Sequence, residues 1–280
     1  MKTSVKLVVI YLLIQLACSL LAGPIMVAYV MLSGGDLKAM EANAMEVVLA
    51  PVMLISMAFM LLYLWKGGFL KKMGPEAWNP VSASYLAWTL VASAGLIFLI
   101  EFVMSWLDFL PNLMENTFVT MSGNWLGILC IAVIGPVLEE LLFRGAVTRM
   151  LLKQYSPVKA IVISGLIFGI FHINPAQVVS ACLSGFFFAW LYWRTRSLVP
   201  GIVLHILNNS LSVWMMANYP DVDTMAQLLG QPEYTICLVA SVAVFAGAVF
   251  MLKRRPVEAV PAETVGACAI PVPENAEKEK

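Results

Sequence analysis

The stretch IAVIGPVLEELLFRGAV, residues 131–147, is the most informative part of this chain, because it places two adjacent carboxylates and one arginine inside an otherwise apolar run. An ionisable side chain in such a run is costly in a membrane and usually has a function. The composition agrees: 61% of the residues are hydrophobic, 12% are charged, and the mean hydropathy is +0.86. These values lie outside the range of soluble globular proteins, so we predict an integral membrane protein.

Apolar runs that are long enough to cross a bilayer as helices recur on both sides of this stretch. About eight can be drawn, at residues 7–32, 47–65, 84–107, 125–143, 157–173, 178–193, 198–216 and 234–252. They are continuous in Leu, Val, Ile, Met and Phe, which favours helices, whose backbone polar groups are satisfied internally. The predicted fold class is all-α, a polytopic membrane helix bundle with about eight transmembrane helices.

The basic residues predict the orientation of the bundle. Short loops that hold Lys and Arg stay on the cytoplasmic side of a membrane. With the N-terminus placed inside, every Lys and Arg except Lys38 falls in an inner segment, including Arg144. We therefore predict that both termini are cytoplasmic.

The chain divides into four predicted parts. Residues 1–124 hold N-terminal transmembrane helices, 125–216 a helical core with the polar motifs, 217–255 a last loop and helix, and 256–280 a disordered cytoplasmic tail rich in Pro, Ala and Glu.

A Walker loop and a dinucleotide fingerprint are both absent from the sequence. The basic residues are already explained by the membrane topology, so we expect no nucleic-acid partner.

Helical geometry separates the polar residues of the string EELLFR, which starts at Glu139. Glu140 and Arg144 share one helix face, with the acid before the base in the favourable order. Glu139 points about 100° away from that face. Glu140 is therefore expected to support the structure, which leaves Glu139 free to act as a general base. The alternative is that both glutamates only pair with basic side chains at the membrane edge.

Two further strings place the two histidines of the chain in apolar helices. In FGIFH, Phe168 lies one helical turn before His172 and can pack against its ring. In HILNN, Asn209 shares a face with His205, and Asn208 is a weaker candidate for the same role. A histidine beside an asparagine could donate two N–H groups to one oxyanion. The asparagines could instead only bond a neighbouring helix.

The order EExxxR, FxxxH and HxxxN resembles the signature of the CAAX protease and bacteriocin-processing (CPBP) family. These intramembrane proteases include the type II CAAX prenyl endopeptidases and the bacterial Abi proteins. The resemblance covers residues 125–216 and shows no departure at the motif positions. It implies an endopeptidase in the lipid bilayer that acts on a peptide or protein substrate, in some members a prenylated one. We expect it in the cytoplasmic (inner) membrane of a bacterium.

Carried over position by position, the resemblance also implies roles for the motif residues. Glu139 would activate a water, His172 would help to hold or deprotonate it, and His205 with Asn209 would stabilise the tetrahedral oxyanion. The supporting residues would be Glu140, Arg144, Phe168 and Asn208.

The resemblance leaves the need for a metal open, because the family has been described both as metalloproteases and as glutamate-dependent proteases. A catalytic zinc normally has three protein ligands plus a water, often within HExxH. HExxH is absent here, although a divalent metal such as zinc could be held by His172, His205 and Glu140 or Glu139. A ligated Glu139 could not act as the base, so we favour a mechanism without a cofactor.

Two functions from other classes explain buried ionisable groups as well. In a transporter or proton relay, Glu139, His172 and His205 would pass protons across the membrane. In a non-catalytic membrane scaffold, the same residues would only bind a partner.

Simple counting does not bring the motifs to one depth. Glu139 lies about 21 Å along its helix from Trp125, and His172 lies about 21 Å from Val158 on the next, oppositely directed helix. Straight helices would therefore separate them. A kink at Gly135-Pro136, continuation of the motif helix beyond its predicted end, or tilting could restore a common site.

Overall fold

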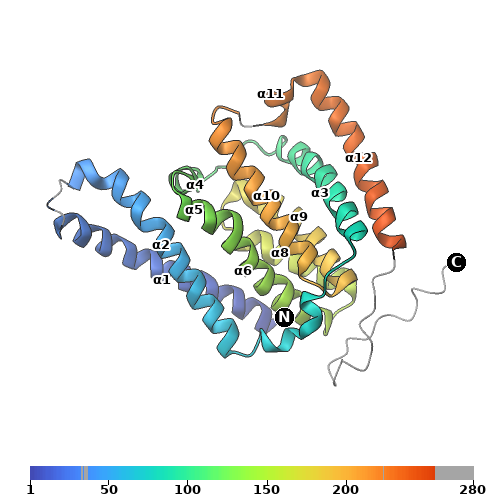
Figure 1. Ribbon diagram of the computed structural model, residues 1–280, viewed down its shortest axis with the longest axis horizontal. Coiled ribbons are helices and arrows are strands. Elements are labelled where there is room, and N and C mark those ends of the chain that lie inside the picture. Colours follow the sequence, from blue (N-terminus) through green and yellow to red (C-terminus); the bar gives the residue numbers. More distant parts are fainter. Residues whose placement is uncertain (33, 35–36, 223, 256–280) are drawn as a thin grey trace.

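The computed structural model describes residues 1–32, 34, 37–222 and 224–255, with the side chains of residues 37–47 left aside. Every helix and turn of this part is shown in Figure 1, and no strand occurs in it, which confirms the predicted all-α fold class. The predicted tail, residues 256–280, lies outside the described residues. The long helices are α1 (Lys2–Leu32), α2 (Leu37–Lys66), α3 (Ala83–Met104), α8 (Pro157–Phe171), α9 (Pro175–Thr195), α10 (Val199–Asn218) and α12 (Gln231–Arg254).

Shorter elements complete the described chain. They are η1 (Lys71–Met73), η2 (Pro75–Trp78), α4 (Glu115–Ser122) and α11 (Met225–Leu229), together with the consecutive segments α5 (Trp125–Leu129), η3 (Cys130–Ile134), α6 (Gly135–Glu140), η4 (Leu141–Thr148) and α7 (Arg149–Leu152).

Seven helices in the described ranges are long and apolar enough to cross a membrane. The predicted number of about eight included α8, which has only 15 residues and is shorter than the roughly 20 residues that a span needs. The polytopic helical bundle is therefore confirmed, with α8 as a shorter apolar helix inside it.

The segments α5 to α7 form one motif helix of 28 residues, from Trp125 to Leu152. Two of these segments, η3 and η4, are wound more widely, as π-helix. In η3 the N–H of Gly135 bonds to the carbonyl of Cys130. This wider turn lets the helix pass Pro136, which has no N–H to donate.

The continuation of the motif helix resolves the depth mismatch expected from the sequence. Counted from the turn between Leu152 and Pro157, Glu139 and His172 lie about 20 Å and about 22 Å along their helices. The predicted span 125–143 was too short. Because α8 is short and starts at the same turn, its end reaches only to the level of Glu139.

The longer helix also corrects the placement of Arg144. We predicted it among the basic residues of the inner segments, but its side chain is 1% exposed and lies within the motif helix. Its charge is tolerated there because Glu140 pairs with it.

The motif helix lies at the centre of the bundle and is the most buried of the seven spans. α8 and α9 pack against each other beside it, and α10 packs along α6 and η3. Figure 1 shows α3 and α12 paired on one side, and α1 and α2 projecting as a hairpin on the other.

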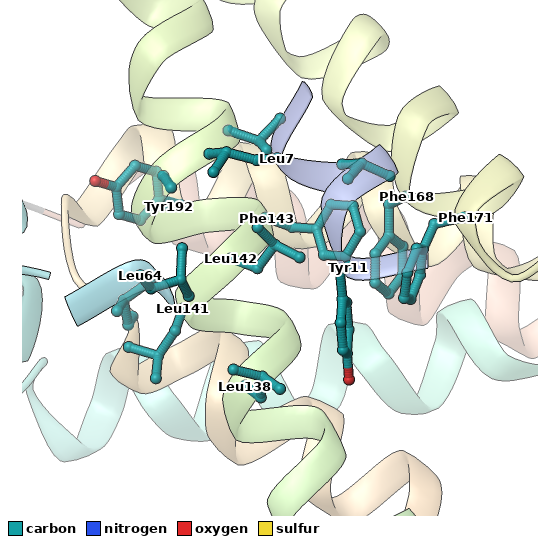
Figure 2. Close-up of a cluster of buried hydrophobic side chains, with 14 of the residues drawn as sticks. Leu7, Tyr11, Leu64, Leu138, Leu141, Leu142, Phe143, Phe168, Phe171 and Tyr192 are labelled. Carbon is teal, nitrogen blue, oxygen red and sulfur yellow. The ribbon is translucent and has the colours of Figure 1, made fainter. Parts of the chain in front are cut away.

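The N-terminal half of α1 belongs to the main hydrophobic cluster (Figure 2). In that cluster Leu7 and Tyr11 pack with Phe143 of the motif helix and with Phe168 and Phe171 of α8. The first helix therefore contributes to the same core as the motifs.

Hydrogen bonds join several of the segments that the basic residues predict to be cytoplasmic. The N-terminal ammonium group of Met1 donates to Gln154, and the hydroxyl of Ser197 donates to the carbonyl of Asn79. Arg194 donates to backbone carbonyls at the end of α12. The cytoplasmic orientation of both termini stays a prediction.

Candidate active site

A buried ion-pair network joins the first motif to the third. Arg144 Nη1 donates to Glu140 Oε1 at 2.8 Å, and the same oxygen lies 3.0 Å from His205 Nδ1. All three side chains are buried. Because an ionised carboxylate only accepts hydrogen bonds, Nδ1 of His205 carries a proton and the ring is held in one orientation. The predicted pairing of Glu140 with Arg144 is confirmed.

Glu139 approaches the opposite edge of the same imidazole. Its Oε2 lies 3.7 Å from His205 Nε2, and its side chain is 19% exposed, whereas that of Glu140 is 0% exposed. Glu140, and not Glu139, forms the ion pair with Arg144, as the helical spacing predicts. One carboxylate therefore holds the histidine from a buried position, and the other borders accessible space.

Phe168 connects the second motif to the third. Its ring centroid lies 4.9 Å from that of His172 and 5.8 Å from that of His205, edge-on in both cases. The guanidinium of Arg144 lies 4.3 Å above the same ring, within the range of a cation–π contact. The predicted packing of Phe168 on His172 is confirmed, and one aromatic ring gathers residues of all three motifs.

His172 is held at the end of α8. Its Nδ1 lies 2.8 Å from the backbone carbonyl of Phe168, and because a carbonyl only accepts, Nδ1 is the donor. The next residue, Ile173, has φ of 59°, a left-handed conformation that is uncommon for a β-branched residue. The helix therefore ends directly after His172. Nε2 is the ring nitrogen that does not bond to the Phe168 carbonyl.

The asparagines of the third motif are placed against the motif helix. Asn209 Nδ2 donates to the carbonyl of Ile131 at 3.0 Å, and Asn208 Nδ2 donates to Asn209 Oδ1 at 3.4 Å. The first contact ties α10 to the wide turn η3, which is the interhelical bond that the sequence left as an alternative. An amide carries two N–H groups, so a role of Asn209 as oxyanion donor stays a prediction.

Two glycines let neighbouring helices come close to the charged groups. The carbonyl of Gly185 accepts from Arg144 Nη2 at 3.3 Å. A Cβ atom on Gly201 would lie 2.8 Å from Glu140 Oε2, closer than atoms normally approach. Neither role could be predicted from the sequence, because neither glycine belongs to a motif.

Phe188 was missed as well. Its ring lies 5.3 Å from the ring of His205 and 5.1 Å from the Arg144 guanidinium. With Phe168 it encloses the ion-pair network in aromatic side chains, which strengthens the electrostatic contacts by excluding water. Phe188 stands in an apolar run of three phenylalanines, so only the three-dimensional contact distinguishes it.

The side chains do not assemble a set of metal ligands. Within the described ranges, no group of three or more His, Cys, Asp or Glu side chains is arranged to hold a metal ion. The two nitrogens of His205 each face a carboxylate. The residues predicted as ligands, His172, His205 and Glu140 or Glu139, do not form such a group among the described residues, and a mechanism without a metal stays a prediction.

The fold and the site define a class: a helical membrane protein with a glutamate–histidine pair buried among its spans. Residues 121–211 match the family model described as "Type II CAAX prenyl endopeptidase Rce1-like". This stretch contains all three motifs, so the predicted resemblance to the CPBP family is confirmed over it.

A curated relative agrees with this match. The Bacillus subtilis (strain 168) protein described as "Putative membrane peptidase YdiL" is 34% identical over 88 residues, which are 31% of this chain and 36% of the relative. The chain thus spans little more than a third of that relative's length. No solved structure matches the chain.

Proposed function

We propose that this protein is an intramembrane endopeptidase that hydrolyses a peptide bond of a membrane-associated or lipidated substrate. The observation that carries the proposal is the Glu139–His205 pair, with 3.7 Å between Oε2 and Nε2 inside a membrane helix bundle. The match of residues 121–211 to a peptidase family supports the reaction class.

Glu139 acts as the general base. It takes one proton from a water, whose oxygen bonds to the carbonyl carbon of the peptide and forms a tetrahedral oxyanion. The C–N bond then breaks, and the proton on Glu139 passes to the leaving amine. The partial exposure of Glu139 lets both the water and the peptide reach it.

His205 stabilises the oxyanion. Glu140 accepts from Nδ1 of the ring, and in the doubly protonated imidazolium Nε2 carries a proton as well. In that form Nε2–H is a donor for the oxyanion, and Asn209 supplies the second N–H. The loss of one such donor typically raises the barrier by about 2.7 to 4 kcal/mol.

The other motif residues support these two. His172 helps to hold the water through Nε2, because its Nδ1 is occupied by the Phe168 carbonyl. Glu140 and Arg144 keep the His205 ring in place. We propose that the reaction uses no metal or other cofactor, since the donors do not form a ligand set.

The substrate is proposed from the family resemblance. A peptide or protein at the membrane is expected, and a prenylated C-terminus is one class to test. It would enter from the cytoplasmic side or from the lipid. We place the protein in the inner membrane of a bacterium.

Peptide hydrolysis in liposomes tests the proposal, with a farnesylated CAAX peptide and a mixed peptide library as substrates. The wild type is expected to cleave at least one peptide, and Glu139→Gln is expected to be folded and inactive. Cleavage by Glu139→Gln at the wild-type rate would refute the role of Glu139. Proton flux through the wild type without any cleavage would favour a proton relay.

A further inference from the structure

Helix α1 brings a buried phenol to the candidate site from outside the matched residues 121–211. Its buried residues Ser4, Leu7, Val8 and Tyr11 recur at helical spacing, so they form one face. That half of the helix packs against η4 and α8. Tyr11 is 1% exposed.

An aromatic stack fixes the Tyr11 ring beside the second motif. It stacks on Phe171 with 5.3 Å between the centroids and 16° between the planes. The ring of Phe171 in turn lies 5.8 Å from that of His172. The direction of the Tyr11 side chain is therefore set by the same helix end that carries the histidine.

The hydroxyl of Tyr11 is directed toward the part of the motif helix that carries Leu138 (Figure 2). Figure 2 shows it pointing to the Leu138 end of the cluster and away from Leu7. Glu139, the residue after Leu138, and Cys130 are the titratable groups of the motif helix that are close enough to act on this hydroxyl electrostatically. No protein hydrogen bond of the described residues involves this hydroxyl. Tyrosine hydroxyls in a protein interior normally have a partner. Tyr11 Oη is not among the fully enclosed side-chain oxygens that lack one, so it borders space that a water can reach.

We propose that Tyr11 is a further active-site residue, and that its hydroxyl and the Glu139 carboxylate hold the same attacking water. The water gives one O–H to Glu139, which removes that proton, and the other O–H to Tyr11 Oη. With both O–H groups engaged, a lone pair of the water oxygen is directed to the peptide carbonyl carbon. Such a bridge is nearly as favourable as a direct hydrogen bond. The inference rests on the proposed function, in which Glu139 activates a water.

Tyr192 offers a matched control in the same cluster. It is 4% exposed, and Figure 2 shows its hydroxyl on the other side of the cluster from that of Tyr11. The charged groups close enough to act on its hydroxyl electrostatically are Arg149, Arg196 and Glu76, and Glu139 is not among them. Removal of this hydroxyl is therefore the same chemical change at a place where it does not face the reacting water.

Kinetics of Tyr11→Phe and Tyr192→Phe test the inference. Tyr11→Phe keeps the stack on Phe171 and removes only the hydroxyl, so we expect kcat to fall about tenfold with KM little changed. Tyr192→Phe is expected to keep the wild-type kcat. If Tyr11→Phe keeps the wild-type kcat, or if both variants lose the same activity, the inference is overturned.

A double-mutant cycle on thermal unfolding separates this inference from the proposed function. It combines Tyr11→Phe with Glu139→Met, which keeps the side-chain length and removes both oxygens. We expect the shifts in Tm to depart from additivity by about 2 °C or more, and the Tyr192→Phe cycle to be additive. If the wild type cleaves no peptide, the proposed function fails. If the Tyr11→Phe and Glu139→Met cycle is also additive, the proposal that Tyr11 and Glu139 hold the same water fails as well. Wild-type cleavage with an additive Tyr11 cycle and unchanged kcat overturns only the inference.

Discussion

The Nε2 atom of His205 lies 3.7 Å from Oε2 of Glu139. The opposite ring nitrogen is held 3.0 Å from Glu140, which is itself paired with Arg144. The two adjacent glutamates thus have different roles. Glu140 is fully buried and holds Nδ1 of the imidazole, whereas Glu139 is partly exposed and faces Nε2. Helical geometry causes this difference, because successive side chains point about 100° apart.

The ion pair under the site is expected to be essential for folding. Arg144→Met leaves the Glu140 carboxylate buried without its cation, so we expect the free energy of unfolding to fall by about 3 to 5 kcal/mol. Denaturant unfolding in detergent measures it. Arg144→Met combined with Glu140→Leu is expected to recover part of the loss, because no lone charge remains. A loss below about 1 kcal/mol in the single variant would contradict a tightly buried pair.

Gly201 is expected to control the position of Glu140. In Gly201→Ala the new Cβ would lie 2.8 Å from Glu140 Oε2, so the carboxylate must shift and His205 with it. We expect a stability loss of about 1 to 3 kcal/mol and about tenfold lower kcat. Gly247→Ala is the control, because nothing lies within 4 Å of its Cβ. Equal effects of the two substitutions would show that the approach to Glu140 is unimportant.

The two asparagines of the third motif are expected to differ in their effect. Asn209→Ala removes the amide that bonds to Ile131 and the proposed second oxyanion donor, so kcat should fall about 100-fold or more with KM little changed. Asn208→Ala removes only a longer contact of 3.4 Å and should have a much smaller effect. If Asn209→Ala lowers stability but keeps kcat, Asn209 serves only to join the helices.

Metal removal is expected to leave hydrolysis unchanged. Both nitrogens of His205 face carboxylates, and His172 Nδ1 is bound to a backbone carbonyl. The measurement is the rate before and after dialysis against a chelator, followed by addition of zinc. A rate that falls with the chelator and returns with zinc would require these side chains to rearrange around a metal.

Much of the fold could be predicted from hydropathy, because long apolar runs leave helices as the available structure in a bilayer. The ends of the motif helix could not. Arg144 and Arg149 resembled the basic edge of a membrane, yet the helix continues to Leu152 because Glu140 neutralises Arg144 inside the bundle. That continuation, together with the shortness of α8, brings Glu139 and His172 to one level.

The site could be predicted where residues lie at helical spacing. Such spacing gave the pairing of Glu140 with Arg144 and the packing of Phe168 on His172. Contacts between distant helices leave no local signal. Phe188 looks like any apolar residue in the sequence, and so does Tyr11 of the first helix.

The most direct test of the central claim is kcat for peptide hydrolysis in Glu139→Gln, His205→Ala and the variant with both changes. If the two residues act as one unit on the same water and oxyanion, the double variant loses about as much activity as the worse single variant. Losses that multiply, with kcat of the double variant reduced by the product of the two single effects, would contradict a concerted glutamate–histidine site.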